Sequence, residues 1–299
     1  MRTRFAPAPT GFLHLGHVVN AIYVWGVARA FAARVVLRIE DHDRQRCRPE
    51  YEAALLDDLD WLGFRPDDYP TDEFRHGRCD SRQSDRGAIY ESAAAELIER
   101  GLVYACQCSR QDLAQVDSDP VTHERRYAGT CRDRGLPLSA DAAWRVRLDP
   151  GEETFDDVIV GAAAQDPSAQ CGDVVIRDRV GNWTYQFVAA VDDLRQDITL
   201  VVRGLDLLPS TGRQIRLARL LGRTVPPTFA HHPLVMKSPD QKLSKSDGDT
   251  GIRDLRAAGW SSARVIAEAA ARAGLAAPST LSAADAADLA ARTARSRRG

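Results

Sequence analysis

Short apolar runs alternate with longer helical patterns at the start of the chain. Residues 2–6 predict a short strand, and the apolar positions between Leu15 and Ala33 fit a largely buried helix. The β-branched run from Arg34 to Glu40 predicts a second strand. A strand, a helix and a strand in so short a span form a βαβ unit, which implies a parallel sheet with a right-handed crossover. Because ligands of such sheets bind beyond the carboxyl ends of the strands, Glu40 lies at a candidate site.

Two further helices are predicted before the pattern changes, at residues 48–63 and 85–100, where Ala, Leu, Glu and Asp recur at helical spacing. Gly101 ends the second of them. Residues 102–182 then contain turns, clustered cysteines and only short apolar runs. This change predicts an insertion between two halves of a nucleotide-binding sheet. Its stretch from Ala162 to Gly172 has little apolar content and predicts an exposed loop.

Core-like sequence resumes after the insertion, at Tyr185 to Val191 and at Ile198 to Val202. A helix is predicted from about Ser210 to Leu221, capped by one of the two hydroxyl residues at its start. Residues 234–236 predict a strand that leads into a lysine-rich loop. Residues 252–299 are rich in alanine and predict helices that end in a basic tail.

Composition restricts the class of protein only loosely. The 299 residues suffice for a full hydrophobic core, and 44% hydrophobic and 27% charged residues are typical of a globular chain. A formal net charge of −2 means that any RNA contact must come from local clusters of Lys and Arg. The sequence has no apolar stretch long enough to span a bilayer and no signal-peptide pattern, and its six cysteines do not indicate a disulfide scaffold. The cytoplasm is therefore the expected compartment.

Two histidines stand at the predicted start of the first helix, directly after a loop rich in Pro and Gly. His14 and His17 are three residues apart, which places both imidazoles on one side of the first helical turn. Backbone N–H groups and the helix dipole favour a phosphate there, and both rings can donate hydrogen bonds to it. Gly16 leaves room for a ribose or adenine ring against the backbone. Histidines that merely cap the helix are the alternative.

A doubly basic loop near the other end of the chain is the second candidate phosphate site. Five of its residues are candidates for ATP binding: Lys242, Leu243, Ser244, Lys245 and Ser246. Lysines this close together usually lie on a solvated surface. If this loop and the histidines close on one triphosphate, however, the two segments together indicate chemistry at the α-phosphate of ATP.

These two segments resemble the signature sequences of class I aminoacyl-tRNA synthetases, and of the glutamyl branch in particular. The stretch from Arg4 to Gly11 is similar to the N-terminal signature of glutamyl enzymes, and Lys-Leu-Ser-Lys-Ser has the form of the second signature. The resemblance covers about residues 2–255. It implies an α/β fold with a Rossmann-type parallel sheet that binds ATP with Mg²⁺. It also implies that His14, His17 and Lys245 stabilise charge at the reacting phosphate.

A selective pocket for free glutamate requires at least one anion and two cations, because the amino acid carries one ammonium and two carboxylates. Glu40 suits the ammonium, and Arg4 and Arg203 can supply planar forks for the carboxylates. Tyr185 can add a hydroxyl contact. For each of these residues alone, an ordinary surface ion pair is the alternative. The resemblance extends the pocket along the N-terminal signature to Phe5, Ala6, Pro7 and Ala8.

One position departs from the family pattern. Ala8 stands where glutamyl enzymes usually have a serine, whose hydroxyl is expected to contact the amino acid. We expect the backbone at Ala8 or the nearby Thr10 to replace this contact, with weaker amino-acid affinity as the consequence.

A cysteine cluster lies inside the predicted insertion. Cys106, Cys108 and Cys131 supply three thiolates from two short segments, and zinc requires four ligands in a tetrahedron. The residue types leave the fourth ligand open between His123 and Tyr127, whereas the resemblance favours Tyr127. With four protein ligands, a single Zn²⁺ is expected to be structural. Reduced thiols without metal are the alternative.

Full glutamyl-tRNA synthetases continue well beyond this length into an anticodon-binding region. A shortened paralogue with this cysteine and tyrosine pattern resembles the glutamyl-queuosine tRNA(Asp) synthetase family. That family activates glutamate without tRNA and transfers the glutamyl group to queuosine in the anticodon of tRNA(Asp). The resemblance therefore predicts ATP, L-glutamate and queuosine-bearing tRNA(Asp) as partners of a monomeric cytoplasmic enzyme that does not contact membranes.

Four segments follow from this interpretation. Residues 1–101 and 183–232 are expected to form the two halves of the Rossmann catalytic domain. Residues 102–182 are expected to form the zinc-binding acceptor subdomain, and 233–299 the lysine loop with a helical C-terminal segment.

Three other functions stay open on the sequence. A minimal glutamyl-tRNA synthetase would charge the 3′ end of tRNA. A small-molecule nucleotidyltransferase would use the same His-x-Gly-His turn but would leave Glu40, Arg203 and the cysteines without a joint explanation. A non-catalytic, zinc-bearing RNA-binding paralogue would have little use for a phosphate site.

Overall fold

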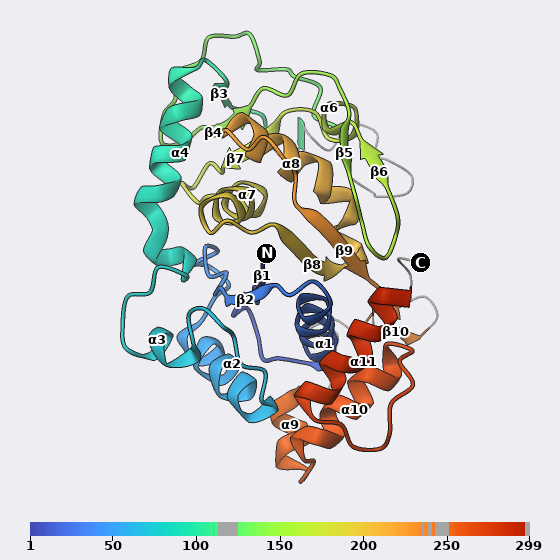
Figure 1. Cartoon of the computed structure of the whole chain (residues 1–299). Helices are drawn as coiled ribbons and strands as arrows, with labels where there is room; N and C mark the ends of the chain where they lie inside the picture. Colours follow the sequence, from blue (N-terminus) through green and yellow to red (C-terminus); the bar gives the residue numbers. More distant parts are fainter. Residues whose placement is uncertain (110, 113–124, 235, 239–240, 243–250, 297–299) are drawn as a thin grey trace.

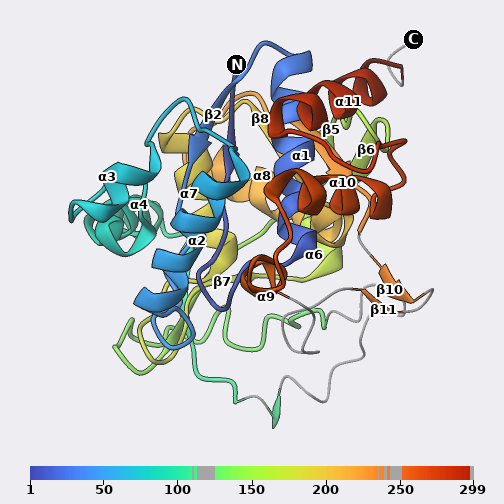
Figure 2. The same cartoon turned by 90° about the horizontal axis from the view of Figure 1, so that it is seen from below.

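The described residues form a mixed α/β fold (Figures 1 and 2). The computed structural model describes residues 1–109, 111–112, 125–234, 236–238, 241–242 and 251–296. No helix among them is long and apolar enough to cross a membrane.

Two pairs of parallel strands lie at the centre of the molecule (Figure 1). They are β1 (Arg2–Phe5) with β2 (Arg34–Leu37), and β8 (Leu200–Gly204) with β9 (Thr228–His232). The backbone N–H of Thr199 donates to the carbonyl of Arg2 over 3.0 Å and joins the second pair to the first. The predicted βαβ unit is therefore confirmed, although its second strand ends at Leu37 and not at Glu40. Strand β9 was not predicted.

Helix α1 (Leu15–Ala30) connects β1 to β2 and is buried on almost every side. It ends earlier than the predicted Ala33, because Ala32 has a φ of +50° and turns the chain toward β2. Gly26 lets α11 (Ala283–Ser296) approach closely, since a Cβ there would lie 2.5 Å from the Cβ of Ala290. The alanine-rich C-terminal sequence thus permits tight helix packing.

The C-terminal helices cover the outer side of α1, whereas α7 (Tyr185–Arg195) and α8 (Thr211–Leu220) lie on the other side of the strands (Figure 1). Besides α11, the C-terminal helices are α9 (Ile252–Ala257) and α10 (Ser262–Arg272). The hydroxyl of Ser261 accepts from the N–H of Arg264 and caps α10. The predicted helical C-terminal segment is confirmed within the described residues.

Both helices predicted between β2 and the insertion are present. The elements here are α2 (Pro49–Leu62), α3 (Thr71–Arg75), the short 3₁₀ helix η1 (Gln83–Arg86) and α4 (Gly87–Glu99). Pro49 begins α2 and Gly63 ends it with a φ of +84°.

An antiparallel sheet distinguishes the region around residues 103–177 from the parallel strands. The sheet consists of β3 (Val103–Cys106), β4 (Ala143–Val146) and β7 (Val174–Arg177). A separate antiparallel hairpin of β5 (Glu153–Phe155) and β6 (Ala163–Gln165) packs against α8. Helix α6 (Pro167–Gln170) follows β6.

The prediction of an exposed loop from Ala162 to Gly172 is therefore wrong. The carboxylate of Asp166 accepts from the N–H groups of Ser168 and Ala169 and caps α6, and Pro167 occupies its first turn. Asp-Pro is thus a helix start here. Few apolar residues are needed because α6 is a single turn and β6 pairs with β5.

One helix cap and one strand boundary in the C-terminal half also differ from the prediction. Helix α8 has the expected range and follows the 3₁₀ helix η2 (Leu205–Ser210), but no side chain caps it. The strand predicted at residues 234–236 corresponds to β10 (Met236–Ser238), which pairs with β11 (Gln241–Lys242). Leu234 directly follows Pro233 and precedes the strand.

Candidate active site

The two histidines of the N-terminal signature form the N-terminal cap of α1. His14 Nδ1 accepts from the N–H of Gly16 over 3.1 Å, and His17 Nδ1 accepts from the N–H of His14 over 3.1 Å. The ring centroids are 4.0 Å apart. A neutral imidazole that accepts at Nδ1 carries its proton on Nε2. Capping the helix therefore makes each ring a hydrogen-bond donor at Nε2. Helix capping by these histidines is thus compatible with phosphate binding.

The segment that follows the lysine loop lies beside these histidines. Gly251 pairs with His14 in an isolated antiparallel bridge, and the N–H of Ile252 donates to the carbonyl of Leu13 over 2.8 Å. On the other side of the loop, Lys242 belongs to β11. Four predicted ATP-site residues lie outside the described residues: Leu243, Ser244, Lys245 and Ser246. Gly251, five residues after the second signature ends at Ser246, thus lies beside the first signature.

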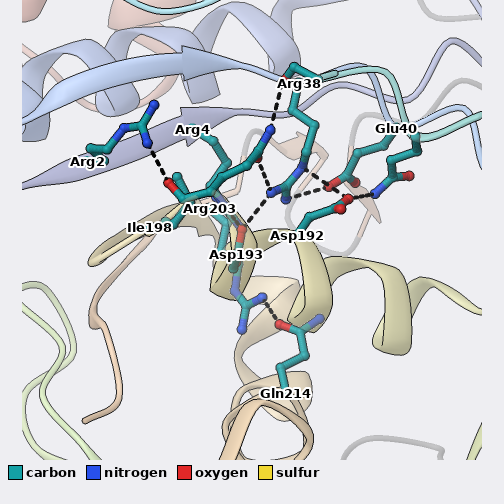
Figure 3. Close-up of polar contacts among 12 residues, drawn as sticks. Arg2, Arg4, Arg38, Glu40, Asp192, Asp193, Ile198, Arg203 and Gln214 are labelled. Atoms are coloured by element: carbon teal, nitrogen blue, oxygen red, sulfur yellow. Dashed lines mark hydrogen bonds and ion pairs between the residues drawn. The ribbon is translucent and has the colours of Figure 1, made fainter. Parts of the chain in front are cut away.

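Glu40 lies in a buried network of charged side chains (Figure 3). Arg38 donates to Glu40 Oε1 over 2.9 Å and to Asp193 Oδ1 over 2.7 Å. Arg4 donates from Nε to the same Asp193 oxygen over 3.1 Å and from Nη1 to the carbonyl of Val202. Asp193, on α7, therefore holds together two arginines from neighbouring parallel strands.

The charges of this network stabilise one another. Burial alone would raise the pKa of Asp193, but the guanidinium groups of Arg4 and Arg38 hold it below the ordinary value. Burial disfavours the Arg38 cation, yet the nearby carboxylates, Asp193 first, raise its pKa. The hydrogen bond from Arg38 also orients Glu40, whose side chain is 10% exposed.

Arg203 lies at the end of β8 in a second buried network. Its Nε donates to His231 Nε2 over 3.0 Å, and its terminal nitrogens donate to Gln214 and Thr211 over 2.5 and 2.8 Å. His231 Nδ1 lies 2.5 Å from Asp157 Oδ2, which also accepts the N–H of His231. Burial lowers the pKa of His231, and Asp157 only partly opposes this shift. The ring is therefore neutral near pH 7, with its proton on Nδ1 and its Nε2 available to Arg203.

Tyr185 begins α7 between these two networks. Burial raises the pKa of its hydroxyl, the negative charge of Glu40 adds to that shift, and the charges of Arg203 and Arg4 oppose it. The phenol is thus neutral at physiological pH and close to all three charged residues. The structure accordingly brings Arg4, Glu40, Tyr185 and Arg203 together.

The N-terminal signature positions the backbone of the pocket. The carbonyl of Phe5 accepts from the N–H of Arg38 over 3.0 Å, and that of Pro7 accepts from the N–H of Glu40 over 3.1 Å. Phe5 packs in the core, and the carbonyl of Ala8 accepts from the N–H of Thr10 over 2.9 Å. These contacts fix the loop containing Ala6 against the strand end that carries Glu40.

An open cleft of about 710 Å³ adjoins the same segment. Pro9, Asp41 and Ser84 line its inner side. Arg44 and Arg48 also line it, are exposed, and form no ion pair with any described residue. The cleft therefore offers two positive charges next to the end of β2.

The three predicted cysteine ligands converge in the antiparallel region. The Sγ atoms of Cys106, Cys108 and Cys131 all lie within 4.8 Å of one another. The hydroxyl of Tyr127 lies 3.5 Å from the sulfur of Cys106 and 3.9 Å from that of Cys108. Three sulfurs this close together are consistent with a zinc site, and the phenol oxygen of Tyr127 lies beside them. His123, the alternative fourth ligand, lies outside the described residues.

The surroundings of the cluster fix Tyr127 in place. A Cβ at Gly172, whose φ is +67°, would lie 2.2 Å from the carbonyl oxygen of Tyr127, so only glycine permits this approach. Burial raises the pKa of Cys108 to about 11. Burial also acts on Cys131, but hydrogen bonds from the Gln107 backbone and from Tyr127 lower its pKa to about 7. One thiol is thus readily ionised, as a metal ligand must be.

Several residues of these networks were not identified from the sequence. Arg38 was predicted only as part of the strand from Arg34 to Glu40, and Asp193, Asp157 and His231 were not assigned. A paired Asp192-Asp193 inside an otherwise apolar helix is the signal that could have revealed the first network, because buried carboxylates require cations. Asp157 gives no comparable signal, since its partner His231 is distant in sequence.

Comparison with known proteins places this geometry in a family. Residues 1–293 match the model described as "tRNA synthetases class I (E and Q), catalytic domain". The Glutamyl-Q tRNA(Asp) synthetase of Burkholderia cenocepacia is 42% identical over 259 residues, which is 84% of this chain and 82% of that protein. The protein of the same name from Rhodobacter capsulatus is 39% identical over 283 residues, 89% of this chain and 98% of its own length.

Solved structures agree with these matches. The glutamate-tRNA synthetase of Elizabethkingia anophelis superposes with a TM-score of 0.76 at 26% identity, covering 97% of this chain and 66% of that one. This chain thus spans slightly less than two thirds of that synthetase. A glutamate tRNA ligase from Elizabethkingia meningosepticum, in complex with its amino acid, gives the same TM-score at 25% identity. The chain belongs to the class I glutamyl- and glutaminyl-tRNA synthetase family.

Proposed function

We propose that this protein activates glutamate with ATP and transfers the glutamyl group to queuosine in the anticodon of tRNA(Asp). The observation that carries the proposal is the match to Glutamyl-Q tRNA(Asp) synthetases over most of the chain, at 39% to 43% identity. A pocket with one carboxylate, two guanidinium groups and a phenol supports glutamate as the amino acid.

In the activation step, the α-carboxylate of glutamate attacks the α-phosphorus of ATP in line with the departing pyrophosphate. We infer a Rossmann-type nucleotide-binding core from the parallel strand pairs, with ATP at the start of α1. His14 and His17 donate from Nε2 to phosphate oxygens as negative charge develops. Lys245 supplies a further positive charge to the phosphates in this proposal. Mg²⁺ supplies further positive charge to the phosphates when it is bound.

Glutamate occupies the space between the two buried networks in this proposal. Glu40, held by Arg38, accepts the ammonium, and Arg4 and Arg203 receive the two carboxylates. Tyr185 donates its neutral hydroxyl. Because Ala8 has no hydroxyl, the backbone of the N-terminal signature contributes the contact at that position.

The antiparallel region is proposed to hold one structural Zn²⁺. Its ligands are Cys106, Cys108, Tyr127 and Cys131, and their converging donor atoms support this assignment. Bound zinc would stabilise residues 102–182 as a subdomain inserted between the catalytic segments 1–101 and 183–232, followed by segment 233–299. Arg44 and Arg48, at the open cleft, are proposed to attract phosphates of the tRNA anticodon loop.

The decisive experiment compares two preparations of tRNA(Asp), from cells that make queuosine and from cells that do not. We expect radiolabelled glutamate to be attached only to the queuosine-bearing tRNA. Glutamate-dependent ATP–pyrophosphate exchange without tRNA is expected to accompany it. Equal labelling of both tRNA preparations would overturn the acceptor assignment.

Charging of the 3′ end of tRNA is the second candidate function. The superposition on glutamate-tRNA synthetases at a TM-score of 0.76 favours it. Labelling of tRNA(Glu) that lacks queuosine would support this alternative.

A further inference from the structure

We propose that His42 is the general base of the transfer step, accepting the proton of the attacking cis-diol hydroxyl. This inference rests on the proposed function and adds a residue that the sequence did not indicate. His42 is half-buried and lies two residues beyond Glu40, five residues after β2 ends at Leu37.

The position of His42 follows from the extended chain that carries it. Side chains two residues apart in an extended segment lie on one face. Arg38 and Glu40 do so, since Arg38 donates to Glu40 over 2.9 Å. His42 continues this series, and its ring centroid lies 6.4 Å from that of Tyr185. The imidazole therefore lies at the border of the proposed glutamate pocket.

The backbone and Gln83 hold this arrangement in place. Ile39 pairs with the chain beside Gln83: its N–H donates to the carbonyl of Ser81 over 3.0 Å, and its carbonyl accepts from the N–H of Gln83 over 3.0 Å. Gln83, in η1, is buried, and its Oε1 lies 2.6 Å from His42 Nδ1.

Asp192 determines which tautomer His42 adopts. Its carboxylate is fully buried, pairs with Arg86 over 2.8 Å, and accepts from Gln83 Nε2 over 2.8 Å. Because a carboxylate only accepts, the amide nitrogen of Gln83 must face Asp192 and the amide oxygen must face His42. An oxygen acceptor at Nδ1 requires the proton there. The neutral ring consequently has its lone pair on Nε2, which forms no hydrogen bond with any described residue.

A base of this kind completes the second half-reaction. The hydroxyl oxygen attacks the carbonyl carbon of glutamyl-adenylate and forms the ester bond. The bond from that carbon to the phosphate oxygen breaks, and AMP leaves with the electron pair. The hydroxyl proton passes to His42 Nε2. Tyr185 on α7 lies beside the ring, and Asp192 lies behind Gln83.

The test separates the two half-reactions in the full-length protein. ATP–pyrophosphate exchange with glutamate measures activation, and a single turnover from preformed glutamyl-adenylate onto queuosine-bearing tRNA(Asp) measures transfer. In His42→Ala we expect transfer to fall by about 100-fold or more while exchange stays within about twofold. Added imidazole should restore part of the transfer rate. His76→Gln, an exposed histidine at the end of α3, is the matched control and should leave both rates unchanged.

A second variant tests the orientation of the ring. Gln83→Leu keeps the imidazole but removes its partner, so transfer should fall by about tenfold without rescue by imidazole. Unchanged transfer in His42→Ala would overturn the proposal and leave the adenylate phosphate as the base. An equal loss of exchange and transfer, or a selective loss that imidazole does not restore, would also overturn it. Absence of glutamate-dependent exchange in the unaltered protein would instead overturn the proposed function itself.

Discussion

The pocket around Glu40 and the cysteine cluster solve the problem of burying polar groups in opposite ways. In the pocket, two arginines face Asp193 and Glu40, so each charge has a counter-charge within the chain. In the cluster, three sulfurs and a phenol converge; Arg134 Nη1 lies 4.0 Å from the sulfur of Cys131, and the Arg145 guanidinium lies 3.7 Å from the Tyr127 ring centroid. Around Glu40 the chain thus supplies a counter-charge for each of these groups, whereas the donor atoms of the cluster favour a cation in its centre.

Removal of the proposed zinc is the largest expected perturbation, because the cysteine cluster would then lose the cation that its donor atoms favour. In zinc-finger peptides, binding of the metal contributes about 10–16 kcal/mol of apparent folding free energy. We expect chelation, or Cys108→Ser, to unfold the antiparallel region, detected as fast hydrogen exchange in β3, β4 and β7. Pyrophosphate exchange with glutamate should survive. Cys47→Ser, outside the cluster, is the control. An unchanged hydrogen-exchange pattern in the metal-free protein would contradict the prediction.

Loss of the charge on Asp193 should have the converse effect and damage the pocket without affecting zinc. Asp193→Asn leaves Arg4 and Arg38 without their shared anion, which is expected to cost about 3–5 kcal/mol of unfolding free energy. Urea denaturation measures this loss, and mass spectrometry measures the zinc content. Asp197→Asn is the matched control, because Asp197 is exposed just beyond the same helix. Equal stability of the two variants would refute the central role given to Asp193.

The third prediction concerns buried histidines and the pH dependence of the unfolding free energy. His232 is buried, stacks on Tyr23 and forms a hydrogen bond with Asn20. Burial lowers its pKa from 6.5 to about 4. The unfolded chain therefore binds more protons between these values, and stability falls as the pH drops from about 6.5 to about 4. A shift of this size corresponds to about 3 kcal/mol, and His231 acts in the same direction.

Urea denaturation at pH 7 and at pH 4.5 measures this loss. His232→Gln removes the titrating ring and should reduce the difference between the two pH values, whereas His76→Gln should not. If His232→Gln retains the full difference, the buried histidine is not its source.

The sequence predicted the elements of the fold well where packing follows local patterns. The strand, helix and strand at the start of the chain, both helices before the insertion, and the alanine-rich C-terminal helices are all present. The loop expected at residues 162–172 and the missed strand β9 are failures of the same kind. Both depend on partners distant in sequence: β6 pairs with β5, and β9 is held by β8.

The sequence identified the residues that are expected to contact ligands. It did not identify the residues that hold those side chains in position. Arg4, Glu40 and Arg203 were named from motifs, and the structure brings them together; their roles remain predictions. Asp193 and Asp157 were not found, because a buried carboxylate differs from a surface one only through its tertiary partners. Gln83 was missed for the same reason, because its role depends on the two side chains that it bridges, His42 and Asp192.

The smallest expected effect tests whether the two regions are independent. Asp157 follows the β5 strand of the antiparallel region, yet it contacts His231, which accepts from Arg203. Asp157→Asn removes the charge that fixes the His231 proton on Nδ1, so Arg203 should lose its preferred orientation. We expect the KM for glutamate to rise about tenfold, or about 1.4 kcal/mol, with the KM for ATP unchanged. Asp156→Asn, at the exposed neighbouring position, should change neither constant. An equal rise of both constants would show that Asp157 only stabilises the fold, and the two regions would then act separately.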